Sequence, residues 1–236
     1  MAFLTGQQAL VLLSEFNISA YFDQMDPERE GEALETTVFG DTARTYIASD
    51  ITDGMISVQG FADGVASAVN SILEPKVNVG GNVCTVAMSR AENDDCYLAK
   101  IIEQQFIQKA SVAGVTRLTG VLKPEGPLDF GWLAHEPSAE TGSGNGASKD
   151  GTAATTDGAR ANLHVAAYAG SGSVTIEIED SADDASWTSI ATFTTYSGVT
   201  SEQISIAGTI RRYVRAKWTL PGGVTSTTFT VAVARL

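Results

Sequence analysis

Two histidines, His135 and His164, are the side chains best suited to act as a general base near neutral pH. A serine hydrolase would place one of them beside a serine in a G-x-S-x-G turn between a strand and a helix. The nearest match, Gly142-Ser143-Gly144, lies in a small, polar stretch with no strand pattern before it and no helix pattern after it. The sequence therefore predicts no catalytic triad, and we expect the protein not to be an enzyme.

The residues that could bind metal do not have the spacing of a known site. Cys84 and Cys96 belong to no C-x-x-C motif, and the chain contains no H-E-x-x-H motif. We expect two reduced thiols, and a single disulfide across a hairpin is the alternative. Carboxylates crowd residues 177–184, but they lack the ladder of a calcium loop. An exposed strand face followed by a turn explains them without an ion, so we predict neither a metal nor a cofactor.

A basic strand follows this acidic stretch. Arg211, Arg215 and Lys217 fall on one face of it, with Tyr213 between the first two. Such a strand could meet an acidic partner. An edge or outer strand whose charges oppose aggregation also accounts for it, and we favour that interpretation.

The charge of the chain is concentrated in its first part. The 236 residues include 15 basic and 28 acidic ones, a net charge of −13. Residues 1–137 carry a net charge of −11, whereas residues 159–236 are neutral. An acidic surface repels phosphate backbones, so sequence-specific DNA binding is not expected. The apolar runs are too short to span a membrane, and the N-terminus lacks a secretory signal pattern, so we expect synthesis in the cytoplasm.

Composition divides the chain near Pro137. Residues 138–158 are small and polar, which predicts a flexible linker between a domain at 1–137 and a domain at 159–236. The second domain alternates apolar and polar residues in six or seven short segments separated by turn residues. This pattern predicts an Ig-like or jelly-roll-like β-sandwich.

The first domain is also expected to be mainly β, with one or two short helices. Segments such as 115–122 alternate in the manner of strands, whereas Phe61, Val65, Val69 and Leu73 share one helical face. Residues 23–53 show little regular pattern. A stretch of this length without secondary structure is unusual inside a compact domain.

Several segments of the chain resemble the major tail (tail tube) proteins of long-tailed bacteriophages. The resemblance is carried by Asn17-Ile18-Ser19-x-Tyr21, Glu35-Thr36-Thr37-x-Phe39-Gly40-Asp41-Thr42-Ala43, Tyr46, Asp53-Gly54, Ser57-Val58-x-Gly60, residues 115–120 and Phe130-Gly131-Trp132. In the second domain it is carried by Asp180-Ser181-Ala182-Asp183, Trp187 and Arg211-Arg212-Tyr213-Val214-Arg215.

The resemblance implies a tail-tube-like β-sandwich whose subunits form rings, usually hexameric, that stack into a hollow tube in the virion. It also implies that the loop between early strands, here residues 23–53, reaches a neighbouring ring. Phe39, Tyr46 and Arg44 are then the expected contact residues. The acidic first domain would line a lumen through which DNA passes without specific binding, with other tail proteins as partners and no membrane. The second domain would project outward.

An alternative is a tail-associated or head-decorating protein whose second domain binds host-surface glycans. Trp187, Tyr196 and Trp218 could supply stacking surfaces for sugars. The same aromatic residues could instead fill the core of the sandwich.

Overall fold

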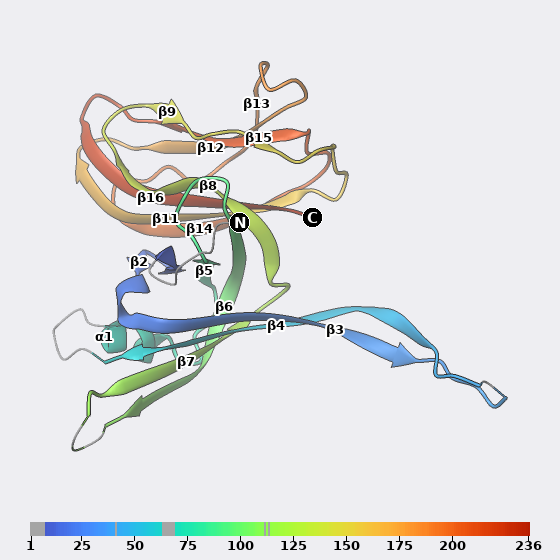
Figure 1. Ribbon diagram of the computed structural model, residues 1–236. Helices are drawn as coiled ribbons and strands as arrows, with labels where there is room; N and C mark the ends of the chain where they lie inside the picture. The colour runs from blue at the N-terminus through green and yellow to red at the C-terminus, as the bar shows by residue number, and fades with distance from the viewer. Residues whose placement is uncertain (1–7, 41, 63–68, 111, 113) are drawn as a thin grey trace.

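The computed structural model describes residues 8–40, 42–62, 69–110, 112 and 114–236. Across these residues the chain is mainly β, as predicted, and its one α-helix, α1 (Val69–Leu73), is short. The strands build two β-sandwiches, one above the other in Figure 1. No helix within these ranges is long and apolar enough to cross a membrane.

The first sandwich is built around one long strand. β6 pairs with β5 over its first half and with β7 over its second half, so it belongs to both layers. One layer is β1–β5–β6 and the other is β6–β7–β4–β3, entirely antiparallel. The strands are β1 (Leu10–Leu13), β3 (Phe22–Glu35), β4 (Tyr46–Phe61), β5 (Asn82–Ala87), β6 (Asp95–Lys109) and β7 (Arg117–Pro124). Short connecting elements are β2 (Phe16–Asn17), η2 (Ser19–Tyr21) and η3 (Glu74–Lys76).

Alternation along the strands produces the core of this sandwich. In β7, Leu118 and Leu122 are buried, whereas Thr119 and Val121 between them are partly exposed. Leu73 of α1 packs in the same cluster as Leu118 and Leu122. Burial of each such leucine stabilises the fold by roughly 1.5–3 kcal/mol.

The second sandwich has its own core between two sheets. Phe229 and Trp218 face each other from opposite sheets, with their rings 5.5 Å apart in an edge-on arrangement. One sheet is β8 (Asp129–Glu140), β11 (Ala159–Gly170), β14 (Thr200–Ile206) and β16 (Val224–Arg235). The other is β9 (Gly144–Asn145), β10 (Lys149–Asp150), β12 (Thr175–Ser181), β13 (Thr188–Thr192) and β15 (Tyr213–Thr219).

The two sandwiches share a buried contact. β8 pairs with β6 of the first sandwich and with β16 of the second, so one sheet continues from one to the other. Leu10, Leu98 and Leu133 pack in a cluster between them. Because this cluster is buried and the sheet is continuous through β8, the two units are held in a fixed orientation.

The flexible linker expected over residues 138–158 is corrected by the structure. This stretch ends β8 and contains β9 and β10. Gly146 N–H donates to the Ala216 carbonyl at 2.9 Å, and the Trp218 indole donates to the Gly142 carbonyl at 2.9 Å. Main-chain hydrogen bonds to the second sandwich order a segment that has almost no apolar side chains to bury.

The structure also corrects the expectations for residues 23–53 and for the helix over residues 61–73. Most of residues 23–53 belongs to a regular hairpin of β3 and β4, not to an irregular loop. The helix predicted over 61–73 exists as α1, but Phe61 ends β4, and residues 63–68 lie outside the described residues. Phe61 is paired with Arg117 of β7, and this strand pairing takes precedence over its helical spacing.

Candidate assembly surfaces

The β3–β4 hairpin projects from the first sandwich as an arm (Figure 1). β4 pairs with β7 only from Ile56 to Phe61, whereas the β3–β4 pairing continues to Glu35 and Tyr46. Eight residues of β3, Glu28–Glu35, therefore extend past the last paired row of β7. At about 3.3 Å per residue, they carry the tip of the arm roughly 25 Å outward.

Contacts at its base fix the direction of the arm. Lys123 of β7 forms an ion pair with Asp53 of β4. This interaction and the adjacent backbone hydrogen bond lower the pKa of Asp53. At Gly54, a Cβ atom would lie 2.8 Å from Cβ of Leu128, so only glycine lets the arm approach the body so closely.

The three residues predicted as contact residues lie at the tip of the arm. Phe39 is fully exposed, Tyr46 is 52% exposed, and the Arg44 side chain is 74% exposed. Arg44 lies 3.9 Å from the Glu35 carboxylate, a loose surface ion pair. The loop is closed by Thr36, which donates its N–H to the Thr45 carbonyl at 2.8 Å. The structure thus brings the three residues together and packs neither aromatic side chain into a core.

The sheet that carries the arm has an unpaired strand edge on each side. Among the described strands, β3 pairs only with β4, and no strand pairs with the second edge of β6 from Gln104 to Lys109. Unpaired strand edges present rows of N–H and C=O groups that can bind another strand. The β3 edge is acidic, whereas Gln104, Gln105, Gln108 and Lys109 make the β6 edge neutral to basic.

The face of this sheet that points away from the core is mostly polar. The pairing register sets Asp26, Ser57, Val121 and Gln105 in one row across the four strands. The next row is Gln24, Gln59, Thr119 and Ile107. The cations near this face are largely neutralised, because Arg117 donates to both oxygens of Asp23 and Lys123 pairs with Asp53.

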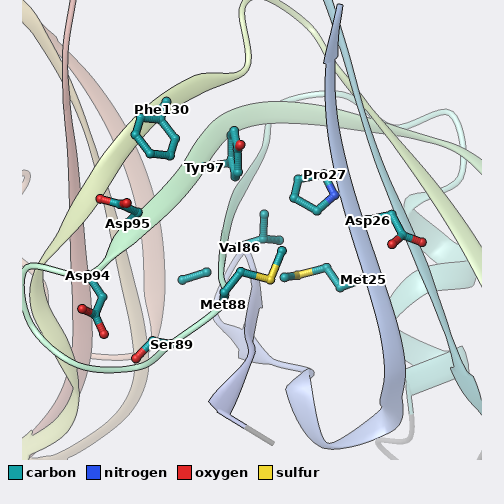
Figure 2. Close-up of a pocket in the computed structure, with 11 residues that line it drawn as sticks. Met25, Asp26, Pro27, Val86, Met88, Ser89, Asp94, Asp95, Tyr97 and Phe130 are labelled. Atoms are coloured by element: carbon teal, nitrogen blue, oxygen red, sulfur yellow. The ribbon is translucent and has the colours of Figure 1, made fainter. Parts of the chain in front are cut away.

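A groove lies at the base of the arm, on the opposite face of β3 from Asp26. Figure 2 shows Met25 of β3 beside Met88, with Tyr97 and Phe130 above them, while Asp26 points away. The groove has a volume of about 520 Å³. A second hollow of about 620 Å³ shares Met25 and Met88 with it and continues toward Ala9 and Arg90.

The acidic stretch and the basic strand of the second sandwich neutralise each other. Asp180, 1% exposed, accepts hydrogen bonds from the backbone and guanidinium of Arg211 at 2.8 and 2.7 Å. Glu179 accepts from Arg215 and Lys217, which outweigh desolvation and lower its pKa. No cluster of potential metal ligands occurs among the described residues. These contacts satisfy the charges of the basic face within the chain. The interpretation of β15 as an edge or outer strand is wrong, because β12 pairs with one side of it and β9 and β10 pair with the other.

The aromatic residues considered for glycan stacking are mostly unavailable. Tyr196 and Trp218 are each 6% exposed and belong to the core of the second sandwich. The ring of Trp187 is covered by the Arg215 guanidinium, 4.0 Å from its centroid. Core packing therefore accounts for two of the three rings.

A serine, a histidine and a glutamate meet near β8, which sequence spacing did not indicate. His135 Nδ1 lies 3.2 Å from Glu92, and its Nε2 lies 3.4 Å from Ser138 Oγ. However, His135 is enclosed between the rings of Trp218 and Phe229. Burial lowers the pKa of His135, and Ser138 donates its hydroxyl to Glu140. This geometry suits an anchor for the β5–β6 connection, because Glu92 also accepts from Ala147 N–H.

The two cysteines are reduced and buried. Burial raises the pKa of the Cys84 thiol to about 12, and the pKa of Cys96 is also raised. Neither thiol is therefore a reactive thiolate near neutral pH. The expectation of free thiols is confirmed, and the alternative of a disulfide is wrong.

Comparison with known proteins finds similarity only at the level of structure. No protein-family model and no curated protein matches the chain. A chain of the virion of a native gene transfer agent particle is 12% identical, with a TM-score of 0.43, over 53% of this chain and 97% of that one. A chain from the tail of an empty gene transfer agent particle, refined with C6 symmetry, is 12% identical, with a TM-score of 0.42, over the same shares.

The third match covers nearly the whole chain. It is the Dit protein of SPP1, described as a paradigm of the hub adsorption apparatus in phages that infect Gram-positive bacteria. It is 11% identical, with a TM-score of 0.41, over 96% of this chain and 99% of that one. The matches are thus components of a virion, a tail and an adsorption apparatus.

Two features of these surfaces were missed from sequence. The groove brings β3, β5, β6 and β8 together from distant parts of the chain, so no local pattern marks it. The open edges follow from strand order, which alternation along single strands does not reveal. Aromatic residues in the sequence at 39 and 46 did mark the arm tip.

Proposed function

We propose that the chain is a non-enzymatic structural subunit of a bacteriophage tail tube. The observation that carries the proposal is the four-stranded sheet β6–β7–β4–β3, which is open at both edges and bears a projecting arm. The resemblance of residues 17–64 to tail tube proteins supports the same role. Hexameric rings, stacking and a DNA-conducting lumen are parts of this proposal.

The directions of the four strands allow this sheet to continue from one subunit to the next around a ring. The four strands alternate in direction, so β3 and β6 run antiparallel to each other. When β3 of one subunit pairs with β6 of the next under rotation about a ring axis, the antiparallel order continues without interruption. A contact between two different edges is heterologous and can close into a ring. The acidic β3 edge and the more basic β6 edge favour this pairing over pairing of like edges.

The face of this sheet that points away from the core has the character expected of the lining of a DNA conduit. Its central rows carry mainly glutamine, serine and threonine, and its acidic residues lie on β3 and, at Asp53, on β4. Lys109 is the cation on this face with no ion pair among the described residues, because Arg117 and Lys123 are paired. Such a surface offers DNA few phosphate contacts and so favours transit over binding.

The second sandwich would then lie outside the tube. Its strands pack on the β1–β5–β6 layer, away from the proposed lumen face. Partners are further copies of the chain and other tail proteins, within the virion.

Negative-stain electron microscopy of the purified protein over a range of concentrations tests the proposal. We expect single rings, stacked rings or tubes with a central hole. Particles without a central hole at every concentration, including after addition of preformed tail-tip complexes, would count against a tube subunit.

A further inference from the structure

The groove at the base of the arm has the composition of a protein-binding site. Met88 is 41% exposed and Phe130 is 47% exposed, so large apolar side chains face solvent together. Tyr97 and Phe130 form an edge-on ring pair 5.3 Å apart, which gives the groove a rigid aromatic wall. Methionine side chains on the other side can adapt to the shape of an inserted group.

The rim of this groove is acidic. Asp94 and Asp95 lie along one side of it, at the start of β6 (Figure 2). Neither carboxylate forms an ion pair among the described residues. An occupant that combines exposed apolar groups with a cation would match both the wall and the rim.

The arm tip has this combination. Phe39 is fully exposed, and Arg44 extends from the same ten-residue loop with only the loose contact to Glu35. The tip cannot enter the groove of its own chain, because Met25 and Pro27 at the arm base form part of the groove and the arm leads away from them. The groove lies at the base of the arm and the matching side chains lie at its tip. The same contact could therefore repeat between successive copies of the chain.

We propose that the groove of Met25, Met88, Tyr97 and Phe130, with Asp94 and Asp95 at its rim, receives the arm tip of a second copy of this chain. Phe39 inserts against the aromatic wall, and Arg44 faces the two aspartates. This inference rests on the proposed function, because it names the acceptor for the arm between neighbouring rings. It requires only a contact between two copies, however, and can be tested without a tube.

A cyclic peptide with the sequence of residues 34–47 provides that test. Binding of the labelled peptide to the full-length protein is expected to be saturable and weakened by salt. Phe39→Ala in the peptide, or Met88→Asp in the protein, should each weaken binding about tenfold or more. The control Asp184→Asn, in an exposed turn of the second sandwich, should leave binding unchanged. Absence of binding, or equal binding to the Met88→Asp protein with its unfolding midpoint intact, would overturn the inference.

Charge reversal tests the predicted orientation. The Arg44→Glu peptide should bind the natural protein more weakly, and the Asp95→Lys protein should bind the natural peptide more weakly. The two altered partners should recover most of the lost affinity when combined. If Asp95→Lys weakens both peptides equally, Arg44 does not face this rim and the stated geometry is wrong.

A cysteine pair separates this inference from the proposed function. Phe39→Cys with Met88→Cys should yield covalent oligomers on oxidation, because the native cysteines are buried. Tubes that form normally without this disulfide would overturn the groove contact and leave the tube subunit standing. Peptide binding and disulfide formation without rings or tubes would support the contact and refute the tube subunit.

Discussion

His164 of β11 donates its Nδ1–H to the carbonyl oxygen of Ser14 at 2.7 Å, across 150 residues of sequence. Its Nε2 accepts from the Thr85 hydroxyl at 2.8 Å. Asn162 on the same strand donates to the Cys84 carbonyl at 2.8 Å. The second sandwich is therefore joined to the first through a buried, hydrogen-bonded histidine that must stay neutral to accept from Thr85.

This arrangement predicts a loss of stability in acid. Burial lowers the pKa of His164 from 6.5 to about 4. The unfolded chain binds more protons than the folded chain between these values, so stability is complete above pH 6.5 and falls as the pH drops toward 4. The loss should be on the order of 3 kcal/mol. Urea unfolding at pH 7 and pH 4.5 measures it.

A matched variant assigns the effect to one histidine. His164→Gln should be less stable than the natural protein at pH 7 and should lose less stability between pH 7 and pH 4.5. An unchanged pH dependence in this variant would assign the acid sensitivity elsewhere, for example to His135.

Glu103 predicts a loss of stability at high pH, in contrast to the loss in acid expected from His164. It is 1% exposed on β6, and its carboxylate oxygens have no hydrogen-bond partner. Burial raises its pKa from 4.5 to about 8, although the nearby Lys76 opposes this shift. The folded state therefore holds a proton that the unfolded state releases, so its stabilising contribution is lost as the pH rises from 4.5 to 8.

Glu103→Gln should remove that dependence. The variant should match the natural protein within about 1 kcal/mol near pH 5 and exceed it by roughly 2–4 kcal/mol at pH 9, because the buried amide carries no charge. Thermal unfolding over pH 5–9 checks this. A natural protein that is equally stable at both ends of this range would contradict the assignment of a buried, protonated carboxyl group.

Strand content could be predicted wherever one strand face is buried. In β7 the alternation of buried Leu118 and Leu122 with more exposed neighbours marks the strand. The arm lacks this signal, because every described side chain from Glu28 to Glu35 is exposed and β4 supplies all of its pairing. Residues 138–158 were misassigned for a related reason, since main-chain hydrogen bonds order them and composition does not record these bonds.

The interaction surfaces were predictable only in part. Phe39 and Tyr46 stood out as aromatic residues in a polar stretch, and both are exposed at the arm tip, where their contact role stays a prediction. The groove joins Met25 to Phe130, more than 100 residues away, so it exists only after the strands have paired. The acidic cluster and the basic strand noted in the sequence likewise belong together, because Asp180 of the first accepts a hydrogen bond from Arg211 of the second.

The pairing of Asp180 with Arg211 predicts insensitivity to calcium. Both Asp180 oxygens already accept from Arg211, and Glu179 accepts from Arg215 and Lys217. Asp183 accepts from the backbone N–H groups of its own turn, so these carboxylates are already occupied. Addition of millimolar calcium or of a chelator should leave the unfolding midpoint unchanged. Asp180→Asn should lower stability by about 2–4 kcal/mol, because it leaves Arg211 without its buried counter-ion. Asp184→Asn, in the adjacent exposed turn, serves as the control, and an equal loss there would show a general effect of charge.

The open edges of β3 and β6 predict that Lys109 influences ring formation. Lys109 lies at the exposed end of β6, on the edge that we propose pairs with the acidic β3 of the next subunit. Lys109→Glu places like charges across every β3–β6 seam, the contact between neighbouring subunits. Each seam should weaken by about 0.5 kcal/mol, so rings should appear only at a higher protein concentration. Higher salt should reduce the difference, since screening weakens exposed charge pairs.

Lys100→Glu is the matched control for this change. It alters the same charge on the same strand, but it lies before the open edge, where β5 already pairs with β6. Sedimentation velocity and electron microscopy of both variants separate the two effects. If Lys100→Glu shifts assembly as much as Lys109→Glu, net charge controls association and the β3–β6 seam does not. If only Lys109→Glu shifts it, the effect is specific to the open edge, as pairing of that edge with the acidic β3 requires.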